Sequence, residues 1–217
     1  MKNKQLISIV ILIGPNRGKE LFKAIRSVLN STYKNYELIL VDNSSNLELK
    51  NEILNKFSSV KLYTMPFNTG MVGYSIGFAK VKGKYILALD DDCTIEKNTL
   101  EKIVLAFNNL PQKVGIIATN VYNPIRKYFY YSKYVRENTR TIYTFPGGAS
   151  AFKKEIFDKI GYYDNDFFCW LHEDDLAIRL INSGYEIYFD KNIIINHHDS
   201  EEYRKIRKNK FVLTIIW

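Results

Sequence analysis

The sequence predicts an α/β protein whose mostly parallel sheet is covered by helices on both faces. Three observations lead to this fold class. Short apolar segments alternate with amphipathic segments through about the first 120 residues. The apolar segments are nearly continuous runs of Ile, Leu and Val, which is typical of strands buried on both faces. The amphipathic segments are long enough to be the helices that connect parallel strands.

The elements of the first half can be justified in chain order. ISIVILI (7–13) predicts a buried strand, because it is almost wholly apolar and mostly β-branched. The next segment, 19–31, carries one apolar stripe at helical spacing and predicts a helix. Gly77 lies inside the helix expected at 73–82 and weakens it. Further strands are expected at 36–42, 60–65, 85–90 and 114–120, and further helices at 47–57 and 99–110.

The second half lacks this regular alternation. Residues 121–145 are rich in tyrosine and basic residues and show no clear period. Gly184 follows an expected helix at the position where glycine is the favoured cap. The segment PGGASAF (146–152) is followed by an expected helix around 153–160, a loop at 161–175, a helix at 175–183 and strands at 185–190 and 192–196. We expect one domain over 1–217, with a nucleotide-type half at about 1–120, a half for a second substrate at about 121–200 and a basic, then apolar segment at 201–217.

Composition sets limits on the partners. The 217 residues carry a net charge of +8, which favours anionic partners such as phosphates, nucleotides or an anionic membrane surface. The two cysteines make no disulfide framework and fit a reducing compartment, so we expect a cytoplasmic protein. No apolar run approaches the ~20 residues that a membrane-spanning helix needs. The segment 201–217 suits a peripheral contact with the inner face of a membrane.

Three consecutive carboxylates, Asp90, Asp91 and Asp92, follow the strand expected at 85–90. Carboxylate oxygens at the end of a strand suit a hard divalent cation such as Mg²⁺ or Mn²⁺, which also takes phosphate oxygens as ligands. A solvated turn that caps the next helix is the alternative. The fully apolar strand before the triplet favours a metal–diphosphate site.

Two weaker signals lie on the same predicted half. Asp42 ends the second strand, where an acid can accept hydrogen bonds from a ribose or a base. The alternative is an ordinary turn, since Asn and Ser residues follow it. The segment 67–77 contains Asn68, Gly70 and two further glycines that would let a backbone approach a ligand closely. Its spacing is not that of a dinucleotide-binding fingerprint.

A second acidic cluster, Glu173 to Asp175, lies at the start of an expected helix, where the helix dipole favours negative charge. Arg179 is four residues beyond Asp175 on the same face, so the two can pair. A carboxylate in this partly apolar loop is expected to have the raised basicity of a general base. His197 and His198 end an apolar strand and suit a metal, although lone histidines are more often structural.

Taken together, these residues resemble the family-2 inverting glycosyltransferases of the GT-A fold. The resemblance runs from about residue 6 to residue 200. KELFKAIRSVLNSTYKNYELILVDNSSN is similar to the opening strand–helix–strand unit of that family, and GKYILALDDD to its metal-binding D-x-D segment. GGASAFKKEIFDKIGYYDNDFF, then EDDLAIRL, is similar to its acceptor-side half. The turn IGPNRGKE departs from the family pattern, and the chain stops soon after the final histidine.

The resemblance implies a role for each group of residues. The nucleotide-sugar site would comprise Asp42, Asn68, Gly70, Asp90 and Asp91. The metal would be held by Asp90, Asp92 and His197, with His198 as the alternative histidine. The catalytic group would comprise Glu173, Asp174, Asp175 and Arg179, and either Glu173 or Asp174 would be the base. The acceptor side would include Gly147, Gly148 and Trp170.

The implied reaction is metal-dependent, inverting transfer of a sugar from a nucleotide-diphosphate sugar to a hydroxyl group. A UDP-sugar is the family default, and the acceptor would be a glycan, a lipid-linked or a polysaccharide molecule. A nucleotidyl or phosphoryl transferase is a second reading, but GPNRGKE lacks the spacing of a phosphate-binding loop. A non-catalytic nucleotide or single-strand nucleic-acid binder is a third, suggested by the aromatic and basic residues at 125–136. Two separate acidic clusters would repel a phosphate backbone, so no nucleic-acid partner is expected.

Overall fold

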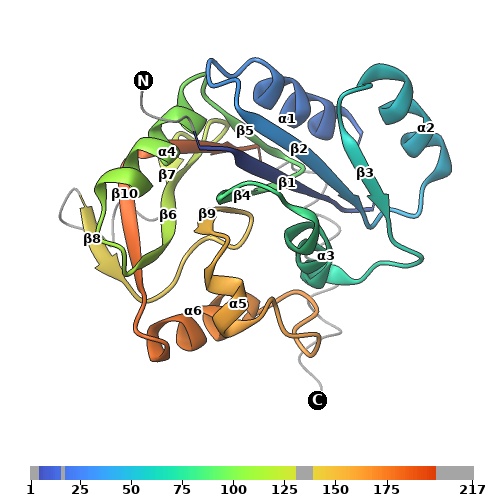
Figure 1. The fold of residues 1–217 in the computed structure, drawn as a ribbon. Helices are drawn as coiled ribbons and strands as arrows, with labels where there is room; N and C mark the ends of the chain where they lie inside the picture. Colours follow the sequence, from blue (N-terminus) through green and yellow to red (C-terminus); the bar gives the residue numbers. More distant parts are fainter. Residues whose placement is uncertain (1–4, 16–17, 131–138, 199–217) are drawn as a thin grey trace.

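The computed structural model describes residues 5–15, 18–130 and 139–198, and it confirms the predicted α/β class (Figure 1). One ten-stranded sheet has the order β3-β2-β1-β4-β9-β6-β10-β5, with β7 on β6 and β8 on β10. The strands are β1 (Ile7–Ile13), β2 (Tyr36–Asp42), β3 (Lys61–Thr64), β4 (Tyr85–Asp90), β5 (Cys93–Ile95), β6 (Val114–Asn123), β7 (Tyr128–Phe129), β8 (Thr139–Ile142), β9 (Ala149–Lys153) and β10 (Glu186–His197). The helices are α1 (Lys19–Leu29), α2 (Leu47–Lys56), α3 (Gly73–Lys80), α4 (Thr99–Asn109), α5 (Ile156–Ile160) and α6 (His172–Asn182), with a 3₁₀ turn, η1, at Gly70–Val72.

The first half forms the parallel part of the sheet. β1 lies between β2 and β4, and all three run in the same direction. Ile13 is opposite Asp42, and Leu12 is opposite Asp90. The carboxyl ends of β2 and β4 therefore meet at one edge of the sheet, where ligands of open α/β sheets bind.

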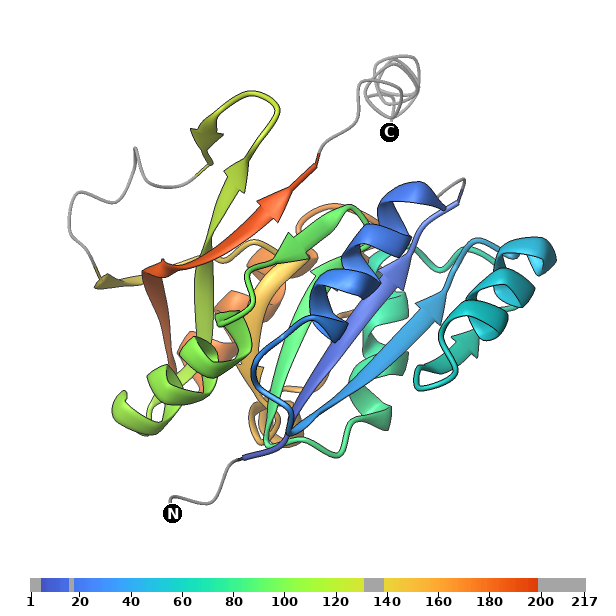
Figure 2. The same ribbon diagram turned by 90° about the horizontal axis from the view of Figure 1, so that it is seen from above.

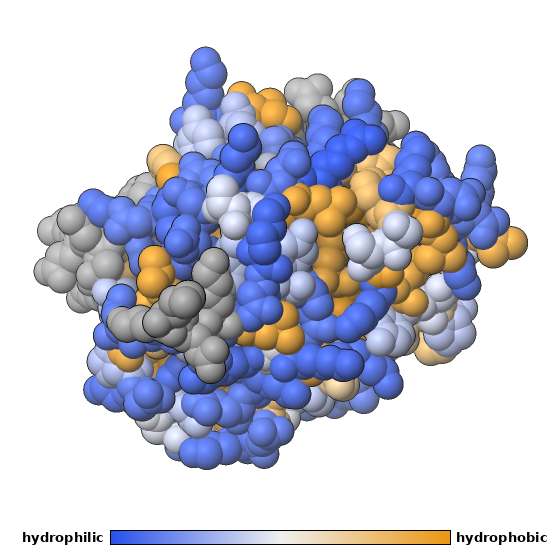
Figure 3. Space-filling model, turned by 45° about the horizontal axis from the view of Figure 1, so that its top comes forward, coloured by the Kyte–Doolittle hydropathy of each residue, from blue (hydrophilic) through white to orange (hydrophobic). Residues whose placement is uncertain are grey.

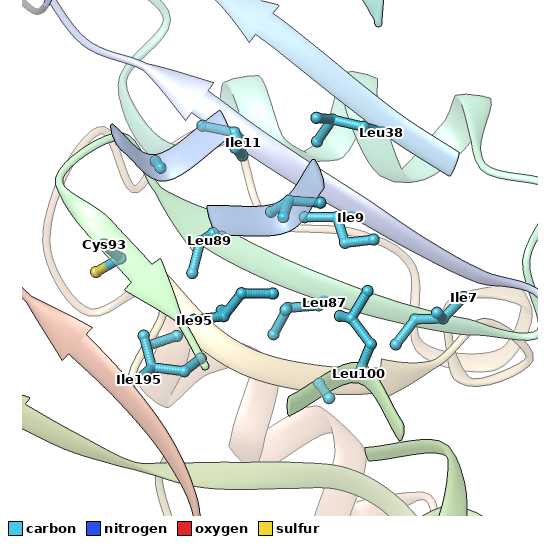
Figure 4. Packing of buried hydrophobic residues seen from close by; sticks show 14 of the residues in the cluster. Ile7, Ile9, Ile11, Leu38, Leu87, Leu89, Cys93, Ile95, Leu100 and Ile195 are labelled. Carbon is cyan, nitrogen blue, oxygen red and sulfur yellow. The ribbon is translucent and has the colours of Figure 1, made fainter. Parts of the chain in front are cut away.

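The sheet separates two hydrophobic cores, because neighbouring side chains of a strand point to opposite faces. Ile7, Ile9 and Ile11 of β1 pack with residues of α1, α2 and α4 on one face (Figure 4). Val10 and Leu12 pack with residues of α3, α5 and α6 on the other. Both faces of the sheet are therefore covered, as the continuous apolar strands predict.

The opposite edge of the sheet is fastened by Glu37, the second residue of β2. Its carboxylate accepts hydrogen bonds from Ser8 Oγ, Lys61 Nζ and the Lys82 backbone N–H, each at 2.6 Å. Burial raises the pKa of Glu37, but these hydrogen bonds outweigh it and hold the pKa below its usual value. One side chain thus ties β1, β2, β3 and the turn before β4 together.

The second half corrects several expectations. No strand was expected within GGASAF, but residues from Ala149 onward form β9, which lies antiparallel between β4 and β6. β7 and β8 were not expected either, nor was β5 in the first half, and all three are short. The two strands expected at 185–190 and 192–196 are one strand, β10, which runs beside β6 with a register shift between Asp190 and Ile194 (Figure 2). α6 begins at His172, three residues earlier than expected, and β6 extends to Asn123.

The predicted glycine cap of α6 is confirmed. Gly184 has φ +83°, a backbone conformation that residues other than glycine rarely adopt. Its N–H donates to the Ile181 carbonyl at 2.9 Å, and the Tyr185 N–H donates to the Leu180 carbonyl at 3.2 Å. These two bonds form a Schellman motif, which ends the helix and turns the chain into β10.

Two predicted segments lie wholly or partly outside the described residues. These are the basic and apolar segment at 201–217 and the second half, 131–136, of the aromatic and basic segment at 125–136. Within the described part of the chain, no helix has the length and apolar character needed to cross a bilayer. The face drawn in Figure 3 is mostly hydrophilic, with hydrophobic residues gathered to the right of its centre.

Candidate active site

Asp42 lies at the carboxyl edge of the sheet, at the last position of β2, and is fully buried. Its Oδ1 accepts hydrogen bonds from the backbone N–H of Ser44 at 2.8 Å and from Ser44 Oγ at 2.5 Å. Its Oδ2 is buried and has no hydrogen-bond partner among the described residues. A buried acceptor without a donor is costly, so this oxygen is suited to a donor group on a ligand.

Asp90 and Asp91 are held at the end of β4 by different partners. Tyr74 of α3 donates its hydroxyl to Asp90 Oδ1 at 2.8 Å. The Gly14 backbone N–H, just beyond β1, donates to Asp91 Oδ2 at 2.8 Å. The first two carboxylates of the triplet are therefore oriented by the neighbouring elements.

Asp92, the third carboxylate, belongs to a cluster with metal-ligand chemistry. β5 runs antiparallel to β10, which places Cys93 opposite His197. His197 Nε2 lies 3.3 Å from Asp92 Oδ1, and the ligand atoms of Asp92, Cys93 and His197 all lie within 4.8 Å of one another. A carboxylate, an imidazole and a thiol at this spacing fit a divalent metal.

This cluster differs from the predicted ligand set in two ways. Asp90 is not part of it, while Cys93 was not predicted. The one feature of the sequence that could have indicated Cys93 as a ligand is its position directly after the aspartate triplet. Burial strongly raises the pKa of the Cys93 thiol, and the charge of Asp92 adds to this effect. The side chain of His198 is directed to Thr94, with its Nε2 2.8 Å from Thr94 Oγ1, although its backbone N–H donates to the Asp92 carbonyl at 2.9 Å. The imidazole beside the Asp92 carboxylate is therefore that of His197.

The second acidic cluster forms the first turn of α6, and its three acids have three different partners. Glu173 Oε2 lies 2.9 Å from His172 Nδ1. Asp174 Oδ1 accepts a hydrogen bond from Thr144 Oγ1 at 2.7 Å. Asp175 pairs with Arg179, whose Nε lies 3.0 Å from Asp175 Oδ2. The predicted Asp175–Arg179 pair is thus present.

Arg179 also fastens α6 to the loop that follows α5. Its guanidinium donates to the carbonyl of Ile160 and, at 2.9 Å, to the carbonyl of Tyr162. The pair with Asp175 orients the guanidinium for these contacts. The structure therefore gives Asp175 and Arg179 a part in holding the start of α6 in place.

The prediction that a carboxylate of this loop has a raised pKa is wrong for Glu173. Burial raises the pKa of Glu173, but the contact with His172 outweighs burial and holds the pKa below its usual value. Sequence reasoning missed this because it did not assign a partner to the carboxylate.

Two adjacent glycines connect the two acidic clusters. A Cβ at Gly148 would lie 2.0 Å from the carboxylate of Asp90, and a Cβ at Gly147 would lie 2.6 Å from His172 Nε2. Neither position has room for a side chain. The segment before β9 therefore lies directly against Asp90 on one side and against His172, the neighbour of Glu173, on the other.

The other predicted site residues lie in two loops that contact each other. Asn68 Oδ1 accepts a hydrogen bond from the Gly70 N–H at 2.9 Å. Gly70 has φ +61°, and a Cβ there would overlap the Phe168 carbonyl. The Met71 N–H donates to that same carbonyl at 2.8 Å. Trp170, in the second loop, is 51% exposed, so it is available to a partner outside the protein core.

Comparison with family models gives two matches. Residues 9–161 match the model described as glycosyl transferase family 2. Residues 131–209 match a model described as the N-terminal domain of galactosyltransferase.

Curated relatives carry related names. An uncharacterized glycosyltransferase of Haemophilus influenzae is 40% identical over 104 residues, which are 46% of this chain and 41% of that protein. A glucosyl-dolichyl phosphate glucuronosyltransferase of Haloferax volcanii is 24% identical over 212 residues, 87% of this chain and 67% of that protein. A second Haemophilus influenzae relative is matched over 33% of its length, so the chain spans well under half of these two bacterial relatives.

Solved structures share the fold. GalNAc-T7, solved with UDP, GalNAc and Mn²⁺, has a TM-score of 0.74 at 18% identity over 91% of this chain and 44% of that chain. A mannosyltransferase of Pyrobaculum calidifontis, solved with GDP-Man and Mn²⁺, has a TM-score of 0.74 at 14% identity over 97% of this chain and 63% of that chain. At these identities the likeness establishes the fold, which is that of GT-A glycosyltransferases.

Proposed function

Because the chain belongs to glycosyl transferase family 2, as its motifs predict, we propose that it is a metal-dependent, inverting glycosyltransferase. The reaction moves a sugar from a nucleotide-diphosphate sugar, with UDP as the nucleotide, to a hydroxyl of a glycan, lipid-linked or polysaccharide acceptor. The family match favours this reaction over nucleotidyl transfer and over nucleic-acid binding.

One observation carries the proposal: both acidic clusters lie against the same two glycines. Gly148 is packed on Asp90 of the triplet, and Gly147 is packed on His172 beside Glu173. A donor bound at the triplet would therefore lie near a carboxylate from the other half of the chain. Single-displacement transfer needs this juxtaposition of a leaving-group site and a base.

On the donor side, the buried and unpaired Oδ2 of Asp42 suits a hydrogen-bond donor of the nucleobase. Asp90 and Asp91, oriented by Tyr74 and Gly14, suit the ribose and the metal site. Asn68 and Gly70 shape the wall of this site by their turn. The two solved neighbours named above contain UDP or GDP-Man with Mn²⁺, which supports a nucleotide in this position.

The metal would be held by Asp92, Cys93 and His197, with Asp90 as the further predicted ligand. A divalent ion held there would offset the negative charge that grows on the leaving diphosphate. The imidazole of His197 suits Mn²⁺ better than the harder Mg²⁺, which prefers oxygen, and the two solved neighbours contain Mn²⁺. We therefore propose Mn²⁺ as the preferred ion.

The base of the proposed reaction is Glu173, with Asp174 as the second candidate. The acceptor oxygen forms a bond to the anomeric carbon while the bond from that carbon to the diphosphate oxygen breaks. The diphosphate leaves with the bonding electron pair, and Glu173 takes the hydroxyl proton. One displacement inverts the configuration once. Gly147, Gly148 and Trp170 line the acceptor side, while Asp175 and Arg179 hold the start of α6.

The test is the anomeric configuration of the product. The protein is incubated with Mn²⁺, a panel of UDP-sugars and hydroxyl acceptors, and proton NMR reads the configuration of the new glycosidic bond from its anomeric signal. We expect a product of inverted configuration. Retention of configuration would contradict the proposal. The cytoplasmic location and the peripheral membrane contact through 201–217 stay predictions.

A further inference from the structure

His172 has no part in the reaction described so far, although it is one of the buried polar residues of the site, only 3% exposed. It is the first residue of α6, after Leu171. Leu171 has φ +66°, a left-handed conformation that is unfavourable for a branched side chain. The chain thus adopts a strained turn directly before the imidazole, and this turn directs His172 inward.

The imidazole is enclosed on three sides. The ring of Tyr163 meets it edge-on, with ring centroids 4.9 Å apart. On the Nε2 side lies Gly147, where even a Cβ would approach to 2.6 Å. On the Nδ1 side lies Glu173 Oε2, at 2.9 Å. Adjacent residues of a helix do not normally face each other, so this contact needs the Glu173 side chain to fold back over the start of α6.

The two oxygens of Glu173 therefore have different surroundings. Oε2 is buried against the imidazole, while the side chain as a whole keeps 29% of its surface exposed. Nδ1 and Oε2 lie within hydrogen-bonding distance of each other, although their relative orientation is not that of a hydrogen bond, and neither atom has a hydrogen-bond partner elsewhere among the described residues. Oε2 is thus enclosed by the protein, while part of the Glu173 side chain stays exposed.

We propose that His172 is a positioning residue: its Nδ1–H holds Oε2 of Glu173, so that the free oxygen faces the acceptor hydroxyl beside Gly147 and Gly148. This inference rests on the proposed function, with Glu173 as base. Such second contacts to a catalytic side chain fix its orientation and set its affinity for a proton. The titratable side chains that contact the imidazole, among the described residues, are Glu173 of α6 and Tyr163 of the preceding loop.

The test compares His172→Asn with His172→Phe. The amide nitrogen of asparagine occupies about the position of Nδ1 and can still donate, whereas phenylalanine fills the space without a donor. We expect His172→Phe to lower kcat by about 10- to 100-fold, the scale of a misplaced catalytic group. The KM for the donor should stay within about twofold, because the donor contacts are elsewhere. His172→Asn should recover most of the lost rate.

The pH profile separates positioning from a merely structural role. The contact with His172 holds the pKa of Glu173 down, so its loss raises that pKa. The acid limb of the kcat/KM profile should therefore move to higher pH in His172→Phe and stay near its original place in His172→Asn. Equal losses in both variants with a lowered melting temperature, or an unmoved acid limb in His172→Phe, would overturn the proposal.

A measurement without catalysis keeps the proposal testable if the variants do not fold. In wild-type protein with ¹³C-labelled glutamate, the carboxyl carbon of Glu173 is titrated and assigned by its absence in Glu173→Gln. A pKa below that of an ordinary glutamate supports the contact, and an ordinary or raised pKa contradicts it. Full transfer activity in Glu173→Gln would instead refute the assignment of the base, and the titration would still report on His172.

Discussion

Asp42 and Asp92 are two carboxylates at the carboxyl edge of the sheet whose surroundings suit a bound ligand. Each is almost wholly buried, and each is held by close neighbours, Ser44 for Asp42 and His197 for Asp92. Burying a carboxylate is costly unless cations or hydrogen-bond donors compensate. Both residues therefore suit the ligands proposed for them, a hydrogen-bond donor of the nucleobase at Asp42 and a divalent cation at Asp92.

The choice of base is decided by comparing Glu173→Gln with Asp174→Asn. Glu173→Gln should lower kcat by about 10²- to 10⁴-fold, the usual contribution of a general base. Binding of the nucleoside diphosphate should be unchanged, since Glu173 lies outside the donor contacts. Asp174→Asn keeps an oxygen that can accept from Thr144 and should cost far less. Initial rates and calorimetry on both variants measure this, and the opposite ranking would make Asp174 the base.

Sequence reasoning located the charged residues of the site but not all of their neighbours. Asp42, Asp90 to Asp92 and Glu173 are visible because acids follow apolar strands or begin a helix. Cys93 and His172 are not visible in this way, because their importance depends on β5 pairing with β10 and on a glycine that allows close packing. Such contacts join residues far apart in the chain and carry no local pattern.

At the scale of elements, the end of α6 allows a sharp test of its glycine cap. Replacing Gly184 by alanine forces a residue with a Cβ to φ +83°. We expect the free energy of unfolding to fall by about 1–2 kcal/mol, measured by urea denaturation. Gly184→Asn is the matched control, because asparagine tolerates this conformation better and should lose less. A larger loss for asparagine than for alanine would contradict the Schellman assignment.

The hydrogen bonds by which Glu37 connects β1, β2 and β3 can be tested by the pH dependence of stability. Its folded pKa is lowered, so its contribution to stability is present above its unfolded pKa and is lost as pH falls through the folded pKa. Glu37→Gln should lower the free energy of unfolding at pH 7 by about 1–3 kcal/mol. Below the folded pKa of Glu37, urea denaturation should show little difference from wild type. An equal loss at pH 7 and at low pH would show that packing, not charge, matters here.

The elements of the first half were predicted better than those of the second, for a physical reason. β1, β2 and β4 have the predicted bounds, because buried parallel strands are long apolar runs with helices between them. β5 and β9 have three and five residues and pair antiparallel with strands distant in sequence. Such strands depend on tertiary pairing rather than on a period, so the sequence alone does not indicate them.

At the scale of the whole molecule, the sheet brings the two halves of the chain into one site. β9, from the second half, lies between β4 and β6 of the first, and β10 extends the sheet on the other side of β6. This interleaving carries His197 to Asp92 and sets Gly148 against Asp90. The proposed donor and acceptor sides are therefore built on one sheet.

The most direct test of the account is calorimetric titration with UDP, GDP, dTDP and ADP, in Mn²⁺ and in EDTA, for wild-type protein and Asp92→Asn. Asparagine keeps the size of the side chain but removes the charge that would hold the ion. We expect one nucleotide, UDP, to bind in Mn²⁺, and we expect this binding to be lost in EDTA and in Asp92→Asn. Binding of no nucleotide, or equal binding with and without metal, would contradict a metal–diphosphate site at the end of β4.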